Sequence, residues 1–136
     1  MKKKKSKSIP IPTESEWQIM EVVWARHGSI TSSDIVKEIQ KIKGIGKTTI
    51  RVLVKRLVEK GLLEYTIDEH DSRIFHYTAI YSRKECQQAK AEDFAKNYFK
   101  GSNMDAIAAL VENSELSDEQ IKNLESILDT IKNKEK

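Results

Sequence analysis

The sequence lacks the features that mark membrane proteins, disulfide-bonded proteins and cysteine-rich metal proteins. Its 136 residues include one cysteine, Cys86, which excludes an internal disulfide and a cysteine-rich metal site. No apolar run approaches the roughly 18–20 residues that a membrane-spanning helix needs. No apolar segment follows the initial lysines, as a signal peptide would require. We therefore expect no membrane insertion, no cofactor, no bound metal and a cytoplasmic location.

An excess of one charge is also missing, because 24 Lys and Arg residues oppose 21 Asp and Glu residues. The distribution is uneven: residues 1–80 carry 15 basic and 10 acidic side chains, and residues 81–136 carry 9 and 11. Five of the basic residues precede the Ile-Pro-Ile-Pro segment, namely Lys2, Lys3, Lys4, Lys5 and Lys7. We expect residues 1–12 to form a disordered basic arm, which either adds salt-sensitive affinity for a polyanion or only raises solubility.

Three helices are predicted between residues 13 and 61. Thr13 and Glu16 have the spacing of a capping box and start the first helix. The hydroxyl and carboxyl side chains of residues 31–34 cap a short second helix. A third helix runs from about residue 47 to residue 60, and Gly61 ends it.

The hydrophobic period then changes from 3.6 to 2, which indicates β-strands. Residues 62–67 and 74–79 are short segments rich in β-branched and aromatic side chains, and the polar segment 68–73 joins them. Three helices followed by a β-hairpin are the order of a winged helix-turn-helix. We expect a mainly α-helical fold with a small β-hairpin, in which residues 13–80 form the winged helix.

The rest of the chain, residues 81–136, is predicted to be helical. Its last helix starts at Ser117, where Gln120 completes a second capping box, and it carries a heptad-like apolar stripe. This stripe packs either on its own chain or on a second copy. Because a domain complete at residue 80 has little core left to offer, we expect a helical dimerisation domain. Its candidate contact residues are Leu110, Val111, Ile121, Leu124, Ile127, Leu128 and Ile131.

The third helix carries the strongest functional signal. Between residues 41 and 60 there are seven basic side chains and one acidic side chain. If Ile50, Leu53, Val54 and Leu57 turn inward, then Thr48, Arg51, Val52 and Lys55 point outward. Arginine can bond guanine, Thr and Val methyl groups can meet the thymine methyl, and lysine neutralises phosphate. The candidate DNA-binding residues are Thr31, Ser32, Lys43, Lys47, Thr48, Thr49, Arg51, Val52, Lys55, Arg56 and Arg73.

Several of these assignments have structural alternatives. The basic third helix is also compatible with a merely solvated surface. Residues 31–33 either hold a phosphate or only cap their helix, and the two roles are compatible. Arg73 either reaches DNA or pairs with the acidic residues around it in segment 68–73. A winged helix can also serve as a protein-docking module, but that class predicts a neutral or apolar third helix. No arrangement of nucleophile, histidine and acid indicates an enzyme.

Five segments resemble the penicillinase and methicillin-resistance repressors, a family of winged-helix transcriptional repressors. They are TESEWQIMEVVW (13–24), KTTIRVLVKRLVEKGLL (47–63), RIFHY (73–77), YFKGS (98–102) and VENSELS (111–117). The resemblance extends over nearly all of residues 13–133. It implies a homodimeric bacterial repressor that binds a dyad operator with half-sites of TACA/TGTA type. By the family pattern, Thr49 and Arg51 fall in the base-reading stretch, and Lys55 and Arg56 lie along the DNA backbone.

The resemblance also implies how repression ends. The copper-responsive branch of the family ends in Cys-x-Cys motifs, whereas this chain ends in Asn-Lys-Glu-Lys and Cys86 stands alone. We expect Cys86 to be a buried apolar residue rather than a sensor thiol. The penicillin-responsive branch is cleaved at an Asn-Phe bond in the dimerisation region, where this chain has Ala109 and Leu110. We expect control of β-lactam resistance genes and release by proteolysis, with a membrane-bound penicillin-sensing protease as partner. A metal- or small-ligand-responsive repressor is the alternative.

Overall fold

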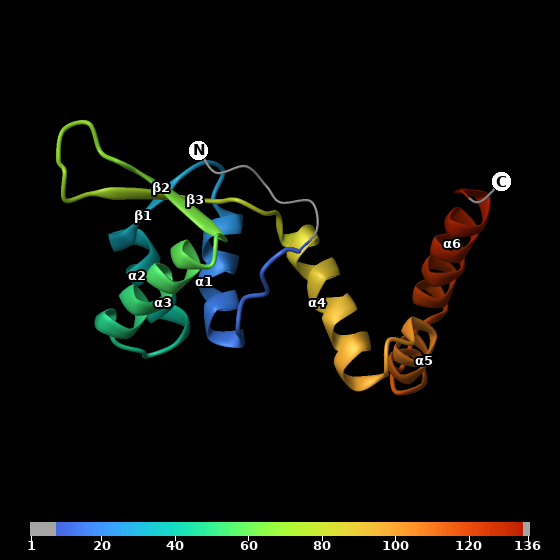
Figure 1. Ribbon diagram of the computed structural model, residues 1–136. Helices are drawn as coiled ribbons and strands as arrows, with labels where there is room; N and C mark the ends of the chain where they lie inside the picture. The colour runs from blue at the N-terminus through green and yellow to red at the C-terminus, as the bar shows by residue number, and fades with distance from the viewer. Residues whose placement is uncertain (1–7, 135–136) are drawn as a thin grey trace. The chain divides into compact units, whose positions relative to one another are not determined.

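The computed structural model describes residues 8–134, which form six helices and three short strands (Figure 1). Residues 1–7, which include the five lysines of the predicted basic arm, and residues 135–136 lie outside the described residues. The predicted class, mainly α-helical with a small β-hairpin, is confirmed. The elements are α1 (Glu14–Ala25), β1 (Ile30–Thr31), α2 (Ser32–Ile42), α3 (Lys47–Glu59), β2 (Leu63–Ile67), β3 (Phe75–Ala79), α4 (Arg83–Tyr98), α5 (Asn103–Glu112) and α6 (Asp118–Lys134).

Helix α1 begins at the predicted capping box. The Thr13 hydroxyl accepts a hydrogen bond from the Glu16 backbone N–H at 3.2 Å, and Glu16 Oε1 accepts one from the Thr13 N–H at 2.9 Å. Two N–H groups that have no partner within the helix are thereby satisfied. The same reciprocal pattern starts α6, between Ser117 and Gln120. Both predicted capping boxes are confirmed.

The sheet contains one strand that the sequence did not predict. Strand β1 has two residues and pairs antiparallel with β3, so the strand order is β1-β3-β2. A two-residue strand is too short to show a hydrophobic period, and its second residue, Thr31, also caps α2 through a bond from the Asp34 N–H at 3.2 Å. Strands β2 and β3 form the predicted hairpin, here called the wing, with Tyr65 opposite Tyr77 and Ile67 opposite Phe75.

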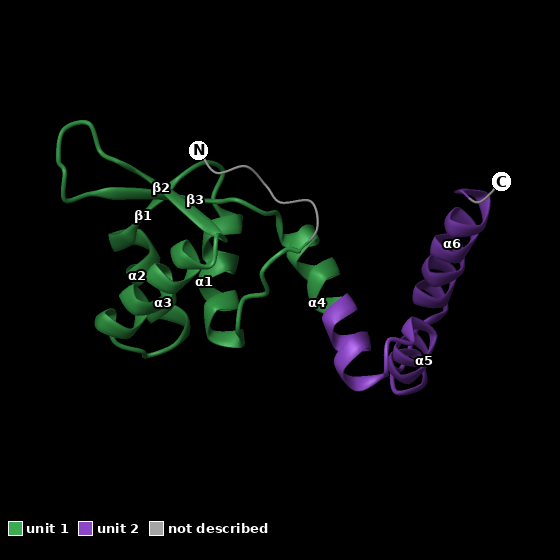
Figure 2. Cartoon of the chain, in the orientation of Figure 1, with its two compact units in different colours: residues 1–91 green, residues 92–136 purple. Residues whose placement is uncertain are grey.

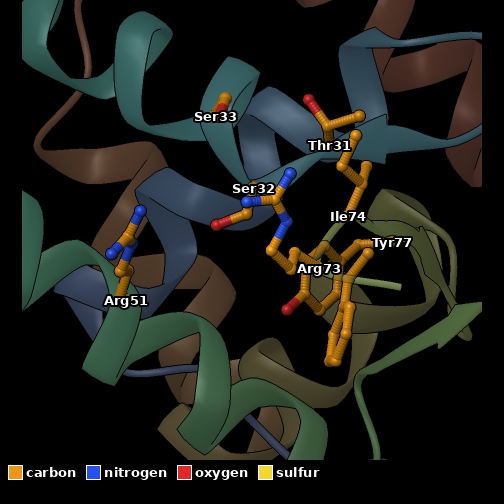
Figure 3. A pocket seen from close by; sticks show the side chains of 8 residues that line it. Thr31, Ser32, Ser33, Arg51, Arg73, Ile74 and Tyr77 are labelled. Atoms are coloured by element: carbon orange, nitrogen blue, oxygen red, sulfur yellow. The ribbon is translucent and has the colours of Figure 1, made fainter. Parts of the chain in front are cut away.

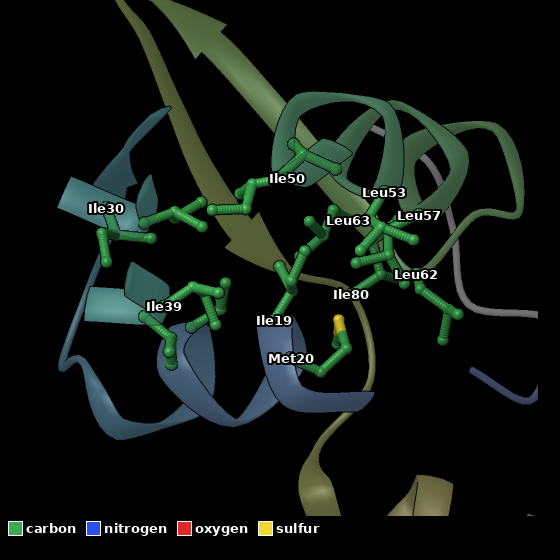
Figure 4. Close-up of a cluster of buried hydrophobic side chains, with 14 of the residues drawn as sticks. Ile19, Met20, Ile30, Ile39, Ile50, Leu53, Leu57, Leu62, Leu63 and Ile80 are labelled. Atoms are coloured by element: carbon green, nitrogen blue, oxygen red, sulfur yellow. The ribbon is translucent and has the colours of Figure 1, made fainter. Parts of the chain in front are cut away.

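The core lies between α1, α2, α3 and the sheet (Figure 4). The four residues of α3 predicted to turn inward, Ile50, Leu53, Val54 and Leu57, are all buried. Each fully buried side chain of this size contributes about 1.5–3 kcal/mol relative to the exposed state. Packing of this apolar face therefore fixes which residues of α3 remain at the surface.

The first of two compact units extends past the predicted boundary at residue 80. The chain divides within α4, between residues 91 and 92 (Figure 2). Tyr81 and Cys86 both belong to the core of the first unit, and the Trp24 indole N–H donates to the Tyr81 carbonyl oxygen at 2.9 Å. The first turns of α4 are thus part of the same packed unit as the winged helix.

The second compact unit, residues 92–136, contains the end of α4 together with α5 and α6. Phe94 packs against Tyr98 and Phe99, with ring centroids 5.5 and 5.4 Å apart. Helix α6 has no buried residue in the single chain. No helix in the described part of the chain combines the length and apolar character needed to cross a membrane.

Candidate nucleic-acid interface

Helix α3 presents its basic residues on the side opposite the core. With its apolar residues buried, the helix leaves exposed all of its predicted DNA-binding residues, namely Lys47, Thr48, Thr49, Arg51, Val52, Lys55 and Arg56. Lys43, in the connection before α3, is exposed as well. Gly46 occupies the N-cap position and makes no side-chain cap, so the first N–H groups of α3 remain open to a ligand. This face can therefore offer guanidinium, ammonium, hydroxyl and methyl groups to DNA.

One charge of the basic segment pairs with a buried carboxylate. Lys60 Nζ lies 2.6 Å from Glu16 Oε1, and the Glu16 side chain is almost completely buried. Burial alone would raise the pKa of Glu16. The hydrogen bond and the charge of Lys60, with hydrogen bonds from Thr13, outweigh burial and hold the pKa below its ordinary value. Lys60 thus ties the end of α3 to the start of α1 rather than serving the exposed face.

A groove of about 300 Å³ brings together candidates from three separate segments (Figure 3). Thr31 and Ser32 come from the start of α2, Arg51 comes from α3, and Arg73 comes from the loop of the wing. The groove is also lined by Ser33, Ile74, Phe75 and Tyr77. None of the eight lining residues is acidic. We call this hollow the wing groove.

Phe75 and Tyr77, the lining residues on β3, are not among the predicted site residues. The alternation of side chains along a strand places Tyr77 on the same face of β3 as Phe75. The sequence pattern does not say which face of the hairpin turns toward α3, so periodicity alone could not assign Tyr77 to the site. The signal that was available is the clustering of aromatic residues near the end of the wing, at Tyr65, Phe75 and Tyr77.

The capping role predicted as one alternative for residues 31–33 is present at Thr31, whose hydroxyl accepts the Asp34 N–H. Ser32 is half-buried and Ser33 is exposed. Both line the wing groove, and both lie in the first turn of α2, where N–H groups lack partners within the helix. The start of α2 therefore retains donors that face the groove.

Arg73 forms the ion pair that the sequence left open. Its Nε and Nη2 atoms donate to the two carboxylate oxygens of Asp71, each at 3.0 Å. Hydrogen bonds from the Arg73 side chain and backbone hold the pKa of Asp71 below its ordinary value. The Arg73 side chain is 88% exposed, so solvent screens this pair and leaves the guanidinium exchangeable.

The loop of the wing is otherwise acidic. Asp68 accepts hydrogen bonds from the N–H groups of His70 and Asp71, at 3.0 and 3.1 Å, and its other oxygen lies 2.9 Å from His76 Nε2. These interactions, with His76 the largest, lower the pKa of Asp68. With Glu69 exposed beside them, the carboxylates outnumber the one arginine. The loop itself therefore adds no attraction for phosphate, unlike α3.

Cys86 is fully buried, as predicted for an apolar core residue. Burial raises the pKa of its thiol to about 11, and the charge of Glu85 acts in the same direction. The thiol is therefore protonated and shielded at neutral pH. Within residues 8–134, no group of three or more His, Cys, Asp or Glu side chains is placed to hold a metal ion.

The candidate dimerisation residues are largely exposed in the single chain. Exposed fractions are 60% for Leu110, 57% for Ile127 and 53% for Leu128. Val111, Ile121 and Ile131 are also exposed, and Leu124 is half-buried. The pair Ala109 and Leu110 lies within α5, near its end. The second unit thus shows an apolar surface that a single chain does not cover.

Comparison with known proteins gives a consistent set of relatives. A family model described as Penicillinase repressor matches residues 12–130. The penicillinase repressor of Bacillus licheniformis is 30% identical over 130 residues, which are 96% of this chain and 98% of that protein. The methicillin resistance regulatory protein MecI of Staphylococcus aureus is 28% identical over 116 residues, 85% of this chain and 91% of that protein. The solution structure of the DNA-binding domain of the repressor BlaI is 29% identical. It covers 56% of this chain and 90% of its own length, with a TM-score of 0.49.

Proposed function

Because this chain belongs to the penicillinase repressor family, whose members are DNA-binding transcriptional repressors rather than enzymes, we propose that it represses transcription by binding a dyad operator as a homodimer. The operator half-sites are of TACA/TGTA type. The observation that carries the proposal is the exposed basic face of α3, which stands free of the core and borders a groove without carboxylates. The proposed site of action is the bacterial cytoplasm, where the operator DNA is found.

The residues of α3 divide by chemistry into base readers and backbone contacts. Thr49 and Arg51 read base edges in the major groove, where a guanidinium can donate to both acceptors of guanine. Lys47, Lys55 and Arg56 neutralise phosphates, which gives affinity and orientation without sequence information. Val52, which is 44% exposed, offers methyl groups to thymine.

Dimerisation is supported by the apolar residues that the single chain leaves exposed on α5 and α6. Isoleucine and leucine side chains on these helices are about half exposed, and burying their remaining apolar surface against a second copy would be favourable. A two-fold dimer also matches the symmetry of a dyad operator, because each half-site then receives one winged helix.

Release by proteolysis is the proposed end of repression, at the Ala109–Leu110 bond and by a membrane-bound penicillin-sensing protease. The regulated genes in this proposal confer β-lactam resistance. Cleavage there would separate α6 from the DNA-binding unit, because the bond lies before it in the chain. Monomers would then lose the advantage of binding two half-sites at once.

The experiment that tests DNA reading replaces Arg51 with alanine and measures affinity by fluorescence anisotropy, on an operator duplex and on a random duplex. We expect the ratio of operator affinity to random-duplex affinity to fall about 10- to 100-fold, since a base contact contributes about 1–3 kcal/mol of discrimination. Lys90→Ala, which removes an exposed charge from α4, should leave this ratio unchanged. An equal loss on both duplexes for Arg51→Ala would contradict base reading.

A further inference from the structure

The side chain of Tyr77 is held in a fixed position at the wing groove. Tyr77 lies on β3 between its partners Ile30 on β1 and Tyr65 on β2. Its ring centroid is 5.9 Å from that of Tyr65 and 6.4 Å from that of Phe75. The ring is half-buried in this aromatic cluster, so its orientation is set before any ligand arrives.

In the described part of the chain, the hydroxyl group of Tyr77 is a donor without a protein acceptor. Within residues 8–134 no side chain or backbone group hydrogen-bonds it, although the residue lines the groove. Partial burial of the ring, together with Tyr65, raises the pKa of Tyr77, and the nearby positive charge of Arg51 acts in the opposite direction. The hydroxyl therefore keeps its proton at neutral pH and can donate it.

The surroundings of this hydroxyl match an anion with several acceptor oxygens. Ser32 and Ser33 bring hydroxyl donors, the positive charge of Arg51 lies beside them, and no lining residue is acidic. The Arg73 guanidinium also lines the groove, and its solvent-exposed pair with Asp71 leaves it exchangeable. Three segments that are distant in sequence converge on the groove (Figure 3), so donors reach it from different directions. Convergent donors of this kind suit a tetrahedral phosphate better than a flat base edge.

We propose that Tyr77 is a DNA-contacting residue whose hydroxyl donates to a backbone phosphate seated in the wing groove beside Arg51. This inference rests on the proposed function, because the phosphate belongs to the bound operator. The contact fixes how deeply α3 enters the major groove, since the sheet that carries Tyr77 packs against α3 through the common core.

The test compares Tyr77→Phe with Tyr65→Phe in the full chain. Both changes remove one hydroxyl from neighbouring strands, but Tyr65 does not line the wing groove. We expect Tyr77→Phe to weaken binding to an operator duplex about five- to tenfold, as for one lost hydrogen bond. The slope of log K against log salt should not change, because the lost group is neutral. Tyr65→Phe should bind as the wild type does, and both variants should keep the wild-type melting temperature.

A second measurement locates the phosphate. A set of operator duplexes is prepared, each with a neutral methylphosphonate in place of one backbone phosphate, so that each duplex lacks one charge at a known position. We expect one position in each half-site to weaken the wild-type chain more than it weakens Tyr77→Phe, because the variant has already lost its hydrogen bond to that phosphate. If every position weakens both proteins equally, or if Tyr65→Phe loses as much affinity as Tyr77→Phe, the assignment of Tyr77 is wrong. The proposed function itself would be overturned by a different result: selection from a pool of random duplexes yields no sequence that the wild-type chain prefers.

Discussion

Two ion pairs in this chain contribute to different properties. Glu16 and Lys60 join the start of α1 to the residue that follows α3, and the carboxylate is almost completely buried. Asp71 and Arg73 pair within the loop of the wing, where the guanidinium is solvated. The first pair should therefore affect stability, and the second should affect DNA affinity.

Replacing Lys60 with methionine should lower the free energy of unfolding by about 2–3 kcal/mol, because the buried Glu16 carboxylate would lose its partner. The value stays below that for a fully buried pair because Lys60 is about one-third exposed. Urea unfolding at pH 7 measures the effect. Lys41→Met, which breaks an exposed pair with Glu38, should cost less than about 0.5 kcal/mol.

The same pair predicts a pH dependence. The pKa of Glu16 is lower in the folded protein than its ordinary value of 4.5, so its contribution is complete above that value. It is lost as the pH falls through the lower folded pKa. As the pH falls below 5, the free energy of unfolding of the wild type should therefore decrease more steeply than that of Glu16→Gln. Identical slopes for the two proteins would show that the Glu16 carboxylate carries no such contribution.

Asp71→Asn should increase affinity for DNA, because it frees Arg73 from its carboxylate and makes the loop less negative. If Arg73 then neutralises one phosphate, the slope of log K against log salt should steepen by about 0.9. Glu69→Gln removes the same charge from the loop without freeing Arg73. Equal effects of the two variants in salt titrations would mean that the general field of the loop, and not Arg73, is responsible.

At the scale of elements, the sequence predicted most of what local chemistry decides. Capping boxes at Thr13 and Ser117 and the buried face of α3 could be read because each depends on spacing within one segment. Strand β1 and the wing groove could not be predicted, because they depend on which segments meet in space. The count of basic residues in the α3 region included Lys60, whose partner Glu16 is 44 positions away.

The boundary within α4 has a similar physical reason. Cys86 lies on α4 but is buried with the winged-helix core, so the first compact unit continues beyond the hairpin. The sequence of α4 does not show which neighbouring element covers an apolar side chain such as Cys86. The buried position of Cys86 accords with its expected apolar role, and its distance from solvent follows from the packing of α4.

Helix α6 should determine the association state. The double change Leu124→Asp with Leu128→Asp places two charges on the apolar stripe and should give monomers in sedimentation velocity, since burying unpaired carboxylates is costly. Ser126→Asp adds a charge to the opposite side of the same helix and should leave the association state unchanged. A double variant that sediments as a dimer would contradict the assignment of the proposed dimer contact to α6.

At the scale of the whole molecule, the proposed DNA-binding and dimerisation tasks fall on different compact units. Residues 1–91 carry the exposed face of α3 and the wing groove, and residues 92–136 carry the uncovered apolar surface. The small net charge of +3 conceals this division. The proposed DNA-binding surface is defined by the positions of the charges on α3, without Lys60, which pairs with the buried Glu16 carboxylate.

The most direct test of the central claim is the stoichiometry and affinity of the full chain on a dyad duplex, before and after insertion of about five base pairs between the half-sites. Such an insertion turns one half-site by roughly half a helical turn. We expect two chains per dyad, and after the insertion an affinity no better than that of a single half-site. One chain per dyad, or an affinity that the insertion leaves unchanged, would contradict a dimeric repressor that reads both half-sites together.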